Sequence, residues 1–485
     1  MTGIARKLSA ILLLLVLGLC VYRARTQSFA VDEAWVYNSF VSQPVSTMAK
    51  YYDACNHVLH TLLMKAALAM FGSGELALRI PSLLGAALYC LAVFRLTSLT
   101  LRGWPQLLAV ALLTLNPLVL DFLVAARGYG LGLGLLFWAL YCALLYQFRG
   151  VKMKWLRLAG LLAGLSTGAN LVFLFPVAAL GLTLMILAWR HGRRGLWEVM
   201  DGYGGPVIVT AFLINVLPLL RATPDLFYFG ATNLMASANS LILSFVKVSG
   251  RWPEPSLRYF AGWIALTILP AALILLAAGF SRTVLRYIRE QRMPFRLTPF
   301  ILPSGMILFS AIALVFAHIV FGVKYPEGRT GIYFIPLFFF AAITGMGLVQ
   351  EERWRHAVKA GNLAGVLFIF IFLVQTDNRY FTNWRYDAAT PRLLRRMHED
   401  FAKRVVVGQK PIQIGTSELI SQTVLYYRSR RRLDWMEEPQ TRDLASFPYE
   451  YYLLTERDSP LVGELGLRVL AHDQLSGETL ARRTP

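Results

Sequence analysis

Long apolar runs recur along this chain as far as Val374, and they restrict its fold more than any other feature. About 20 consecutive apolar residues cross a bilayer of roughly 30 Å as a helix. The chain has 485 residues, of which 56% are hydrophobic, and a mean hydropathy of +0.51, so it is too apolar for a soluble protein. We predict about eleven spans by this measure, near 8–22, 79–101, 105–124, 128–148, 156–168, 171–189, 204–220, 259–280, 301–322, 331–349 and 358–375.

The fifth and sixth runs meet at Gly168-Ala169-Asn170, so this region is either a hairpin or one bent helix. Arg6-Lys7 precedes the first run, and no small-residue cleavage site follows it, which favours an uncleaved signal-anchor. The four cysteines, Cys20, Cys55, Cys90 and Cys142, lack CxxC spacing, so neither a disulfide framework nor a zinc cluster is supported.

The net charge of +20 comes from short basic clusters between the apolar runs, at 149–157, 190–194, 282–296 and 353–359. Clusters of this kind are typical of cytoplasmic loops and anionic lipid surfaces, and they argue against nucleic acid as a partner. If the N-terminus is cytoplasmic, these clusters all fall inside. An odd number of spans then places the C-terminus outside.

Three segments lie on the predicted outer side: the first loop at 23–78, the loop at 221–258 with Trp252-Pro253-Glu254-Pro255, and a tail at 377–485. Within the first loop, 57–71 is short for a span and fits a helix lying at the interface. We therefore divide the chain into a mainly α transmembrane domain, 1–376, and an extracytoplasmic α/β domain, 377–485.

The tail alternates strand-like and helical patterns. We predict strands at 411–415, 432–436, 449–454 and 467–470, and a helix at 417–431 capped by Thr416 or Ser417. It contains no evident catalytic motif, and we assign it to acceptor binding or stability.

An acidic pair, Asp32-Glu33, follows the first apolar run by about ten residues. Carboxylates beside a membrane are costly to desolvate, so their placement needs a reason. They could cap a helix that begins at Ala34, since acids favour helix N-termini. The motifs that follow them favour catalysis.

Four further motifs stand at predicted outer span ends. Asn56-His57-Val58-Leu59-His60 lies in the first loop, and Phe-Gly-Ser-Gly-Glu-Leu-Ala-Leu-Arg-Ile-Pro-Ser closes it at 71–82. Ala-Ala-Arg-Gly-Tyr-Gly-Leu occupies 125–131, and Tyr-Pro-Glu-Gly-Arg-Thr occupies 325–330. In this order they resemble the membrane-embedded glycosyltransferases of the GT-C superfamily, including protein mannosyltransferases and the aminoarabinose and lipopolysaccharide-core transferases. Many relatives place an acid just before the alanine that precedes the arginine of the 125–131 motif. This chain has Val124 and Ala125 there, and Asp121 is the nearest carboxylate.

The resemblance implies sugar transfer, with inversion, from a polyprenyl-phosphate donor to an extracytoplasmic hydroxyl. Such a reaction needs a base for the acceptor proton and cations for the departing phosphate. Asp32 is the expected base, with Glu33 as its neighbour or a metal ligand. Arg329 and Arg127 are the expected phosphate ligands because guanidinium matches phosphate oxygens, although both could instead be interfacial arginines. Lys324 is a further candidate for the phosphate, and Asn56, His57, Tyr129 and Tyr325 are candidates for substrate binding.

His57 and His60 are three residues apart, so we expect them to share a helix face with Asp53 one turn earlier. Imidazole and carboxylate together could hold a divalent metal, so Mg, Mn or Zn stays open. His318 lies deep in a span and is interpreted as a satisfied polar residue.

The expected partners are a polyprenyl-phosphate sugar, a lipid, glycan or protein acceptor, and membrane lipids. The expected location is a bacterial inner membrane with the active site on the extracytoplasmic side. Two alternatives stay open: a transporter that flips lipid-linked sugars, and a non-catalytic binding protein of the same fold. Midplane charges would favour transport, but the charges here gather at span ends.

Overall fold

The computed structural model describes residues 2–148, 152–223, 226, 229–246, 263, 267–290, 297–348, 355–404 and 411–483. Parts of the expected loop 221–258, including Trp252 to Pro255, lie outside these residues. So do the first part of the span expected at 259–280, the basic residues Arg149, Arg292, Arg296 and Arg353, and the final Pro485.

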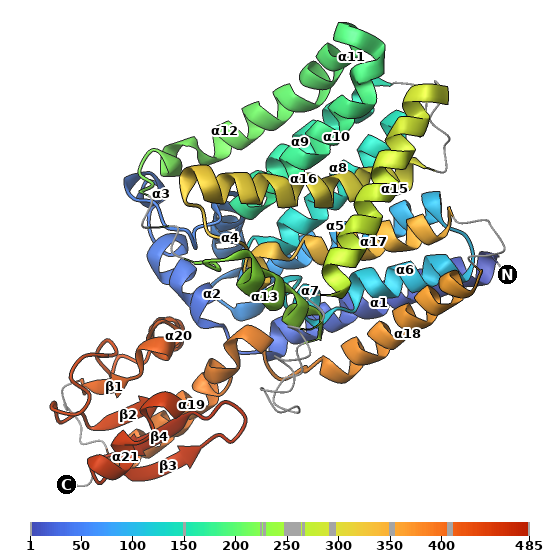
Figure 1. Cartoon of the computed structure of the whole chain (residues 1–485). Coiled ribbons are helices and arrows are strands. Elements are labelled where there is room, and N and C mark those ends of the chain that lie inside the picture. Colours follow the sequence, from blue (N-terminus) through green and yellow to red (C-terminus); the bar gives the residue numbers. More distant parts are fainter. Residues whose placement is uncertain are drawn as a thin grey trace.

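The first 375 residues form a helical bundle (Figure 1). Among the described residues, nine helical stretches are long and apolar enough to cross a membrane: Gly3–Thr26, Glu75–Thr100, Tyr129–Phe148, Leu171–Ala188, Gly192–Leu219, Pro270–Arg289, Thr298–Phe321, Gly328–Met346 and Arg355–Gln375. The prediction of a polytopic helical membrane protein is confirmed. The bundle helices are α1 (Thr2–Thr26), α5 (Glu75–Thr100), α6 (Trp104–Thr114), α7 (Pro117–Phe122), α8 (Tyr129–Phe148), α9 (Met153–Ala169), α10 (Leu174–Ala188), α11 (Gly192–Val199), α12 (Gly205–Leu219), α13 (Leu234–Val246), α15 (Ile268–Glu290), α16 (Thr298–Phe321), α17 (Phe334–Met346) and α18 (Arg355–Gln375).

Two of the expected spans differ from these long helices. The run at 156–168 is α9, which has 17 residues and ends at Ala169 because the backbone of the next residue, Asn170, is extended at φ −165° and ψ 128°. The run at 105–124 divides into α6 and α7 because Pro117 begins a new helix and the Asn116 side chain accepts hydrogen bonds from the amides of Leu118 and Val119. Hydropathy alone does not register this cap.

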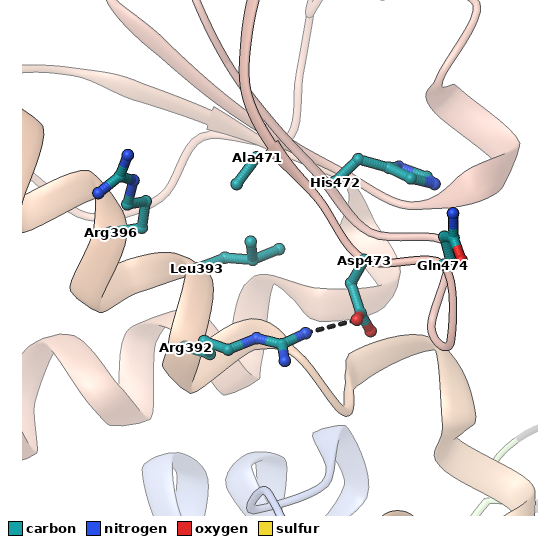
Figure 2. Close-up of a pocket in the computed structure, with 7 residues that line it drawn as sticks. All are labelled: Arg392, Leu393, Arg396, Ala471, His472, Asp473 and Gln474. Carbon is teal, nitrogen blue, oxygen red and sulfur yellow. Dashed lines mark hydrogen bonds and ion pairs between the residues drawn. The ribbon is translucent and has the colours of Figure 1, made fainter.

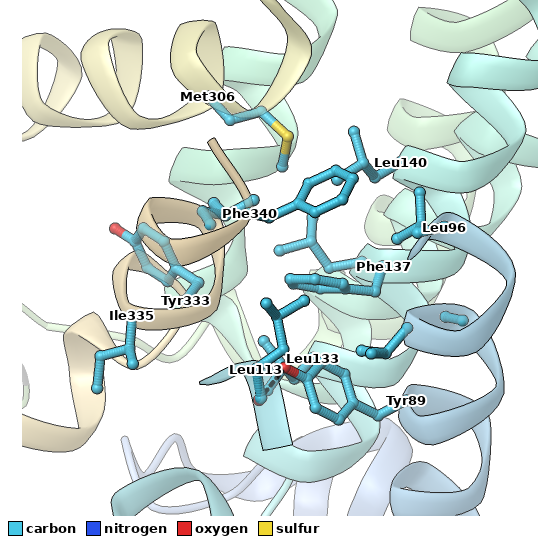
Figure 3. Packing of buried hydrophobic residues seen from close by; sticks show 14 of the residues in the cluster. Tyr89, Leu96, Leu113, Leu133, Phe137, Leu140, Met306, Tyr333, Ile335 and Phe340 are labelled. Atoms are coloured by element: carbon cyan, nitrogen blue, oxygen red, sulfur yellow. Dashed lines mark hydrogen bonds between the residues drawn. The ribbon is translucent and has the colours of Figure 1, made fainter. Parts of the chain in front are cut away.

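Helices α5 and α8 approach closely through glycines. A Cβ at Gly85 would lie 2.5 Å from the backbone of Leu131, and one at Gly134 would lie 2.6 Å from the carbonyl oxygen of Gly85. Small residues let membrane helices pack backbone against backbone. The core lies beside this contact, where Phe137 of α8 meets Tyr89 of α5 edge-on and Phe340 of α17 lies on the other side of Phe137 (Figure 3).

The first outer loop folds into α2 (Val31–Val36), a π-helical turn η1 (Tyr37–Val41), α3 (Thr47–Lys50) and α4 (Val58–Phe71). Helix α4 corresponds to the expected interfacial helix, and it leaves Met70 and Phe71 exposed at its end. The acidic pair lies in the first turn of α2, which begins at Val31 and not at Ala34.

After α18 come a 3-10 turn η8 (Thr382–Asp387) and α19 (Thr390–Ala402), followed by a small α/β unit. Its strands are β1 (Ile414–Thr416), β2 (Tyr451–Leu454), β3 (Arg468–His472) and β4 (Thr479–Arg482), in the order β1-β2-β4-β3. Strands β1 and β2 are parallel, and β4 is antiparallel to both β2 and β3. The expected helix is α20 (Glu418–Arg431), with Ser417 at the N-cap position but without a capping side-chain hydrogen bond.

Two strand predictions in this unit need correction. The strand expected at 432–436 is reduced to a single bridge between Ile412 and Met436, because Arg432 turns the chain with a left-handed φ of 51°. Strand β4 was not predicted. Its four residues form a strand because β2 and β3 pair with it on both sides, a tertiary effect that outweighs local propensity.

The α/β unit packs against the first outer loop through α20 (Figure 1). The ring of Tyr426 stacks on Phe29 with centroids 4.3 Å apart, and the Tyr427 hydroxyl accepts a hydrogen bond of 2.9 Å from the Phe29 amide. Arg430 forms an ion pair with Glu75 at the start of α5. These contacts join the C-terminal unit to the segment that leads into Asp32.

Candidate active site

Asp32 lies between two guanidinium groups that come from distant parts of the chain. Its Oδ2 atom is 3.3 Å from Nη2 of Arg329 and 3.7 Å from Nη2 of Arg127. Both separations exceed the roughly 2.8 Å of a strong charge-assisted hydrogen bond. Oδ2 is buried and accepts no hydrogen bond from the described residues. The carboxylate is therefore held near two cations, and its Oδ2 atom receives no hydrogen bond from the described residues.

Arg127 is fixed by the irregular segment between α7 and α8. Its side chain is only 2% exposed, and Nη1 donates to the carbonyl oxygens of Asp32 at 3.3 Å and Cys55 at 3.4 Å. The next residue must be small, since a Cβ at Gly128 would lie 1.8 Å from the carbonyl oxygen of Ala169. The burial of the Arg127 side chain is inconsistent with an arginine that snorkels to the interface. Its Nε is buried and has no partner among the described residues.

Arg329 is more accessible, with its side chain 18% exposed. It lies in the 3-10 turn η6 (Gly328–Gly331). The guanidinium carbon is 4.4 Å from the ring centre of Phe229 and 5.9 Å from that of Trp384. These rings hold the cation by cation–π attraction without occupying all its donors.

Helix α13 anchors the turn that carries Arg329. The Gly328 amide donates to Ser240 Oγ at 2.9 Å, and Ser237 Oγ donates to the Pro326 carbonyl oxygen at 2.6 Å. The position of Arg329 is therefore fixed by the hydrogen bonds between α13 and the turn and by the aromatic rings around the guanidinium.

Glu33 has a different environment from its neighbour. Its side chain is fully buried and accepts two hydrogen bonds from Arg79, at 2.9 Å from Nε and 2.6 Å from Nη2. It also accepts from the backbone amides of Ala30 and Ala126. Arg79 in turn donates to three carbonyl oxygens, those of Ala24, Gln27 and Ser28. Both carboxylate oxygens are thus occupied by the protein itself.

His57 and Asn56 lie beside Arg127. His57 is buried, its Nε2 is 3.2 Å from Nδ2 of Asn170, and its ring meets Tyr129 edge-on with centroids 5.3 Å apart. Burial, and then the charge of Arg127, lower the pKa of His57 well below its ordinary value, so the ring is neutral near pH 7. Asn56 accepts from Thr61 through Oδ1, and its buried Nδ2 has no partner among the described residues.

The metal site expected from Asp53, His57 and His60 is not formed. Helix α4 begins at Val58, so Asp53 does not share a helix face with the histidines and instead accepts from Trp35 Nε1 and the Cys55 amide. His60 lies against Ser82 Oγ at 2.9 Å. Across the described ranges, no three His, Cys, Asp or Glu residues lie close enough together to hold a metal ion.

Two other candidates stand apart from this arrangement. The Tyr325 backbone pairs with Ala231 in a short antiparallel bridge, and its ring stacks on His318 at 4.2 Å. Lys324 is half-buried and forms no ion pair with a described residue. Neither forms a hydrogen bond or ion pair with Asp32 in the part of the chain that the structure describes.

Asp121, the nearest acid to the 125–131 motif, is also committed elsewhere. It pairs with the buried Arg23 of α1, and its Oδ2 accepts a 2.8 Å hydrogen bond from the Thr382 amide. It therefore links α1 and α7 to the segment after α18.

A cavity of about 430 Å³ lies in the C-terminal unit between α19 and the β3–β4 turn (Figure 2). Arg392 and Asp473 pair across one side of it. None of the predicted site residues lines this cavity.

Some residues around Asp32 were not predicted from the sequence: Arg79, Phe229, Trp384 and Asp387. The signal for Arg79 was present, because it stands in the 71–82 motif and a buried acid needs a cation. Phe229, Trp384 and Asp387 could not be predicted in the same way, because they lie in segments whose composition does not distinguish them from other loops.

No protein-family model matches this chain, and no curated protein matches it. Solved structures do. ArnT from Cupriavidus metallidurans bound to undecaprenyl phosphate aligns over 99% of this chain and 98% of its own, with 14% identity and a TM-score of 0.50.

The chain has the GT-C membrane glycosyltransferase fold. The resemblance drawn from the sequence motifs is thus confirmed as a fold. An oligosaccharyltransferase from Archaeoglobus fulgidus in complex with zinc and sulfate aligns over 92% of this chain and 68% of its own, with 13% identity and a TM-score of 0.49.

Proposed function

We propose that this GT-C protein transfers a sugar from a polyprenyl-phosphate carrier to the hydroxyl group of an extracytoplasmic acceptor. The observation that carries the proposal is the position of Asp32, a carboxylate whose Oδ2 atom accepts no hydrogen bond from the described residues and lies 3.3 and 3.7 Å from two arginines. One such group can take a proton while the cations stabilise a phosphate. The likeness in fold to a protein bound to undecaprenyl phosphate supports the choice of donor.

In the proposed step, Asp32 removes the proton from the acceptor hydroxyl as its oxygen forms a bond to the anomeric carbon of the sugar. The bond from that carbon to the phosphate oxygen breaks, and polyprenyl phosphate leaves with the electron pair. A single displacement of this kind inverts the anomeric configuration. Arg329 and Arg127 bind the phosphate, and the unpartnered Nε of Arg127 supplies a donor for it.

The roles of the neighbouring residues follow from their surroundings. Glu33, with both oxygens occupied, supports the loop instead of accepting a proton. His57 is neutral and is suited to hydrogen bonding with substrate hydroxyls alongside Asn56, with Tyr129 packed behind it. Lys324 and Tyr325 are proposed to contact the donor only at the edge of the site.

The test uses purified protein and a panel of polyprenyl-phosphate pentoses and hexoses, with release of polyprenyl phosphate as the readout. Asp32→Asn keeps the shape and removes the base, so release should fall about 10²–10⁴-fold. Asp53→Asn is the matched control, because Asp53 lies in the same loop and its carboxylate bonds to Trp35 and the Cys55 amide.

Full activity in a folded Asp32→Asn variant would remove the base assignment. Movement of the donor across a proteoliposome membrane without release of polyprenyl phosphate would establish the transporter alternative. Donor binding with neither release nor movement would establish a non-catalytic binding protein.

A further inference from the structure

The helix that carries Asp32 has no capping side chain at its N-cap position. Its N-cap residue is Ala30, and a helix start leaves backbone amides that need acceptors. Glu33 reaches back to the Ala30 amide at 2.7 Å. The Val31 amide, next to Asp32, donates instead to Oδ2 of Asp387 at 2.6 Å, from 356 residues away.

Asp387 is fixed where it stands. It is 1% exposed, and the hydroxyl group of Thr423 on α20 lies 3.4 Å from its Oδ2. It is the last residue of η8, the first element after the final span. The carboxylate therefore comes from the chain that enters the C-terminal unit, while the amide it receives belongs to the first outer loop.

The short turn η8 contacts the site at a second point. Trp384, also in η8, is buried and lies 5.9 Å from the Arg329 guanidinium. The amide of Thr382, at the start of the turn, is held by Asp121 at 2.8 Å. The η8 turn therefore contacts both α2, the helix that carries Asp32, and Arg329, the ion-pair partner of Asp32.

We propose that Asp387 is a positioning residue for sugar transfer, acting as a tertiary cap that fixes the first turn of α2 and holds Asp32 against Arg329. This inference rests on the proposed function of Asp32. It assigns the C-terminal unit a part in completing the site, because α20 buries Asp387.

The charges that face Asp387 are consistent with a cap that works by accepting a hydrogen bond. Burial and the nearby Glu478 raise the pKa of Asp387 well above its ordinary value, and Glu33 and Asp32 add to this, while the Val31 amide lowers it. The side-chain carbonyl oxygen of asparagine can take the same position as the carboxylate oxygen and accept the hydrogen bond from the Val31 amide. Asparagine is also a strong capping residue, so Asp387→Asn should retain the cap.

The experiment compares Asp387→Ala and Asp387→Asn in the full-length protein. Misplacing a catalytic group by a small distance costs about 10²-fold in rate. We therefore expect kcat of the alanine variant to fall about 10–100-fold with little change in KM for the donor, since the ground-state contacts remain. The asparagine variant should stay within about threefold of the parent.

Hydrogen exchange provides a readout that does not depend on activity. Peptides covering Val31 to Val36 should exchange faster in Asp387→Ala than in the parent, while peptides of α10 should not change. Faster exchange in α2 with an unchanged kcat would overturn the positioning role. Equal activity losses in the folded alanine and asparagine variants would overturn capping as its cause.

The two proposals fail in different ways. If the parent releases no polyprenyl phosphate but exchange in α2 still depends on Asp387, the cap is real and the proposed reaction is wrong. If Asp387→Ala does not fold, the asparagine variant decides. Activity of a folded Asp387→Asn protein within about threefold of the parent supports the cap, and a larger loss contradicts a cap that needs only an acceptor.

Discussion

Asp32 and Glu33 are adjacent, carry the same functional group and have opposite surroundings. Glu33 accepts four hydrogen bonds and pairs with the fully buried Arg79, whereas Oδ2 of Asp32 has no hydrogen-bond donor among the described residues. Removing one partner of a buried ion pair typically costs about 3–5 kcal/mol, so Glu33 supports the fold of the loop. Successive residues of a helix point about 100° apart, which is enough to place one acid in the core and the other in the site.

At the same scale, the two arginines can be told apart by substitution. Arg329→Ala should lose most polyprenyl-phosphate binding and transfer, and Arg329→Lys should keep part of both, because lysine retains the charge but not the bidentate fork. Donor affinity is measured directly by titration with polyprenyl phosphate. Arg157→Ala is the control, since Arg157 forms an exposed pair with Asp201. If Arg329→Ala binds polyprenyl phosphate as tightly as the parent, the phosphate site is centred on Arg127.

At the scale of elements, buried acids act as caps between segments distant in sequence. Glu478, just before β4, accepts from the Ala389 amide at 2.7 Å and from the Thr390 hydroxyl group at 2.5 Å, at the start of α19. Asp387 does the same for α2. The N-cap residues of these helices, Ala30 and Ala389, have no polar side chain, so Asp387 at the end of η8 and Glu478 just before β4 supply acceptors.

These caps predict a pH-dependent stability. Burial raises the pKa of Glu478 from 4.5 to about 7, although hydrogen bonds from Thr390, Ala389 and Ser476 lower it and Asp473 raises it further. A folded state with the higher pKa binds more protons than the unfolded state. The stabilisation is therefore complete below pH 4.5 and is lost as the pH rises to about 7, at up to roughly 1.4 kcal/mol per pH unit.

Glu478→Gln removes this titration. We expect the apparent melting temperature of the variant, relative to the parent, to rise between pH 4.5 and 7 and then to level off, as followed by thermal unfolding in detergent. The raised pKa of Asp387 acts in the same direction; its largest cause, burial, remains in the variant, whereas the contribution of the Glu478 charge is lost. A temperature difference that stays constant across this range would show that Glu478 does not titrate there.

At the scale of the whole molecule, the basic helix α11 and the C-terminal unit lie at opposite ends of the bundle (Figure 1). With the positive-inside rule, this arrangement predicts that Arg194 faces the cytoplasm and Asp32 the outside. Reporter fusions after Arg194 and Arg296 should therefore be cytoplasmic, and fusions at Trp252 and Pro485 should be external. A cytoplasmic signal at Pro485 would mean an even number of crossings and would make α9 and α10 the first region to re-examine.

The sequence alone determined the class of fold and singled out three residues that the structure places next to one another. Hydropathy predicted the membrane helices because a span must satisfy its backbone internally and present apolar side chains. The motifs at 31–34, 125–131 and 325–330 led to Asp32, Arg127 and Arg329, which the structure brings together. These are the residues whose chemistry is visible in their type and in their place at span ends.

Tertiary structure decided what surrounds them. The break at Asn116, the strand β4 and the missing Asp53–His57–His60 cluster all depend on contacts that local patterns do not encode. Arg79 pairs with Glu33 and not with Asp32, and this contact decided which of the two adjacent acids belongs to the core. The cap on α2 came from Asp387, a residue 356 positions away from Val31. Residue type and periodicity fix which groups a segment can offer, but a buried polar group is defined by its partner, and partners are chosen when the chain folds.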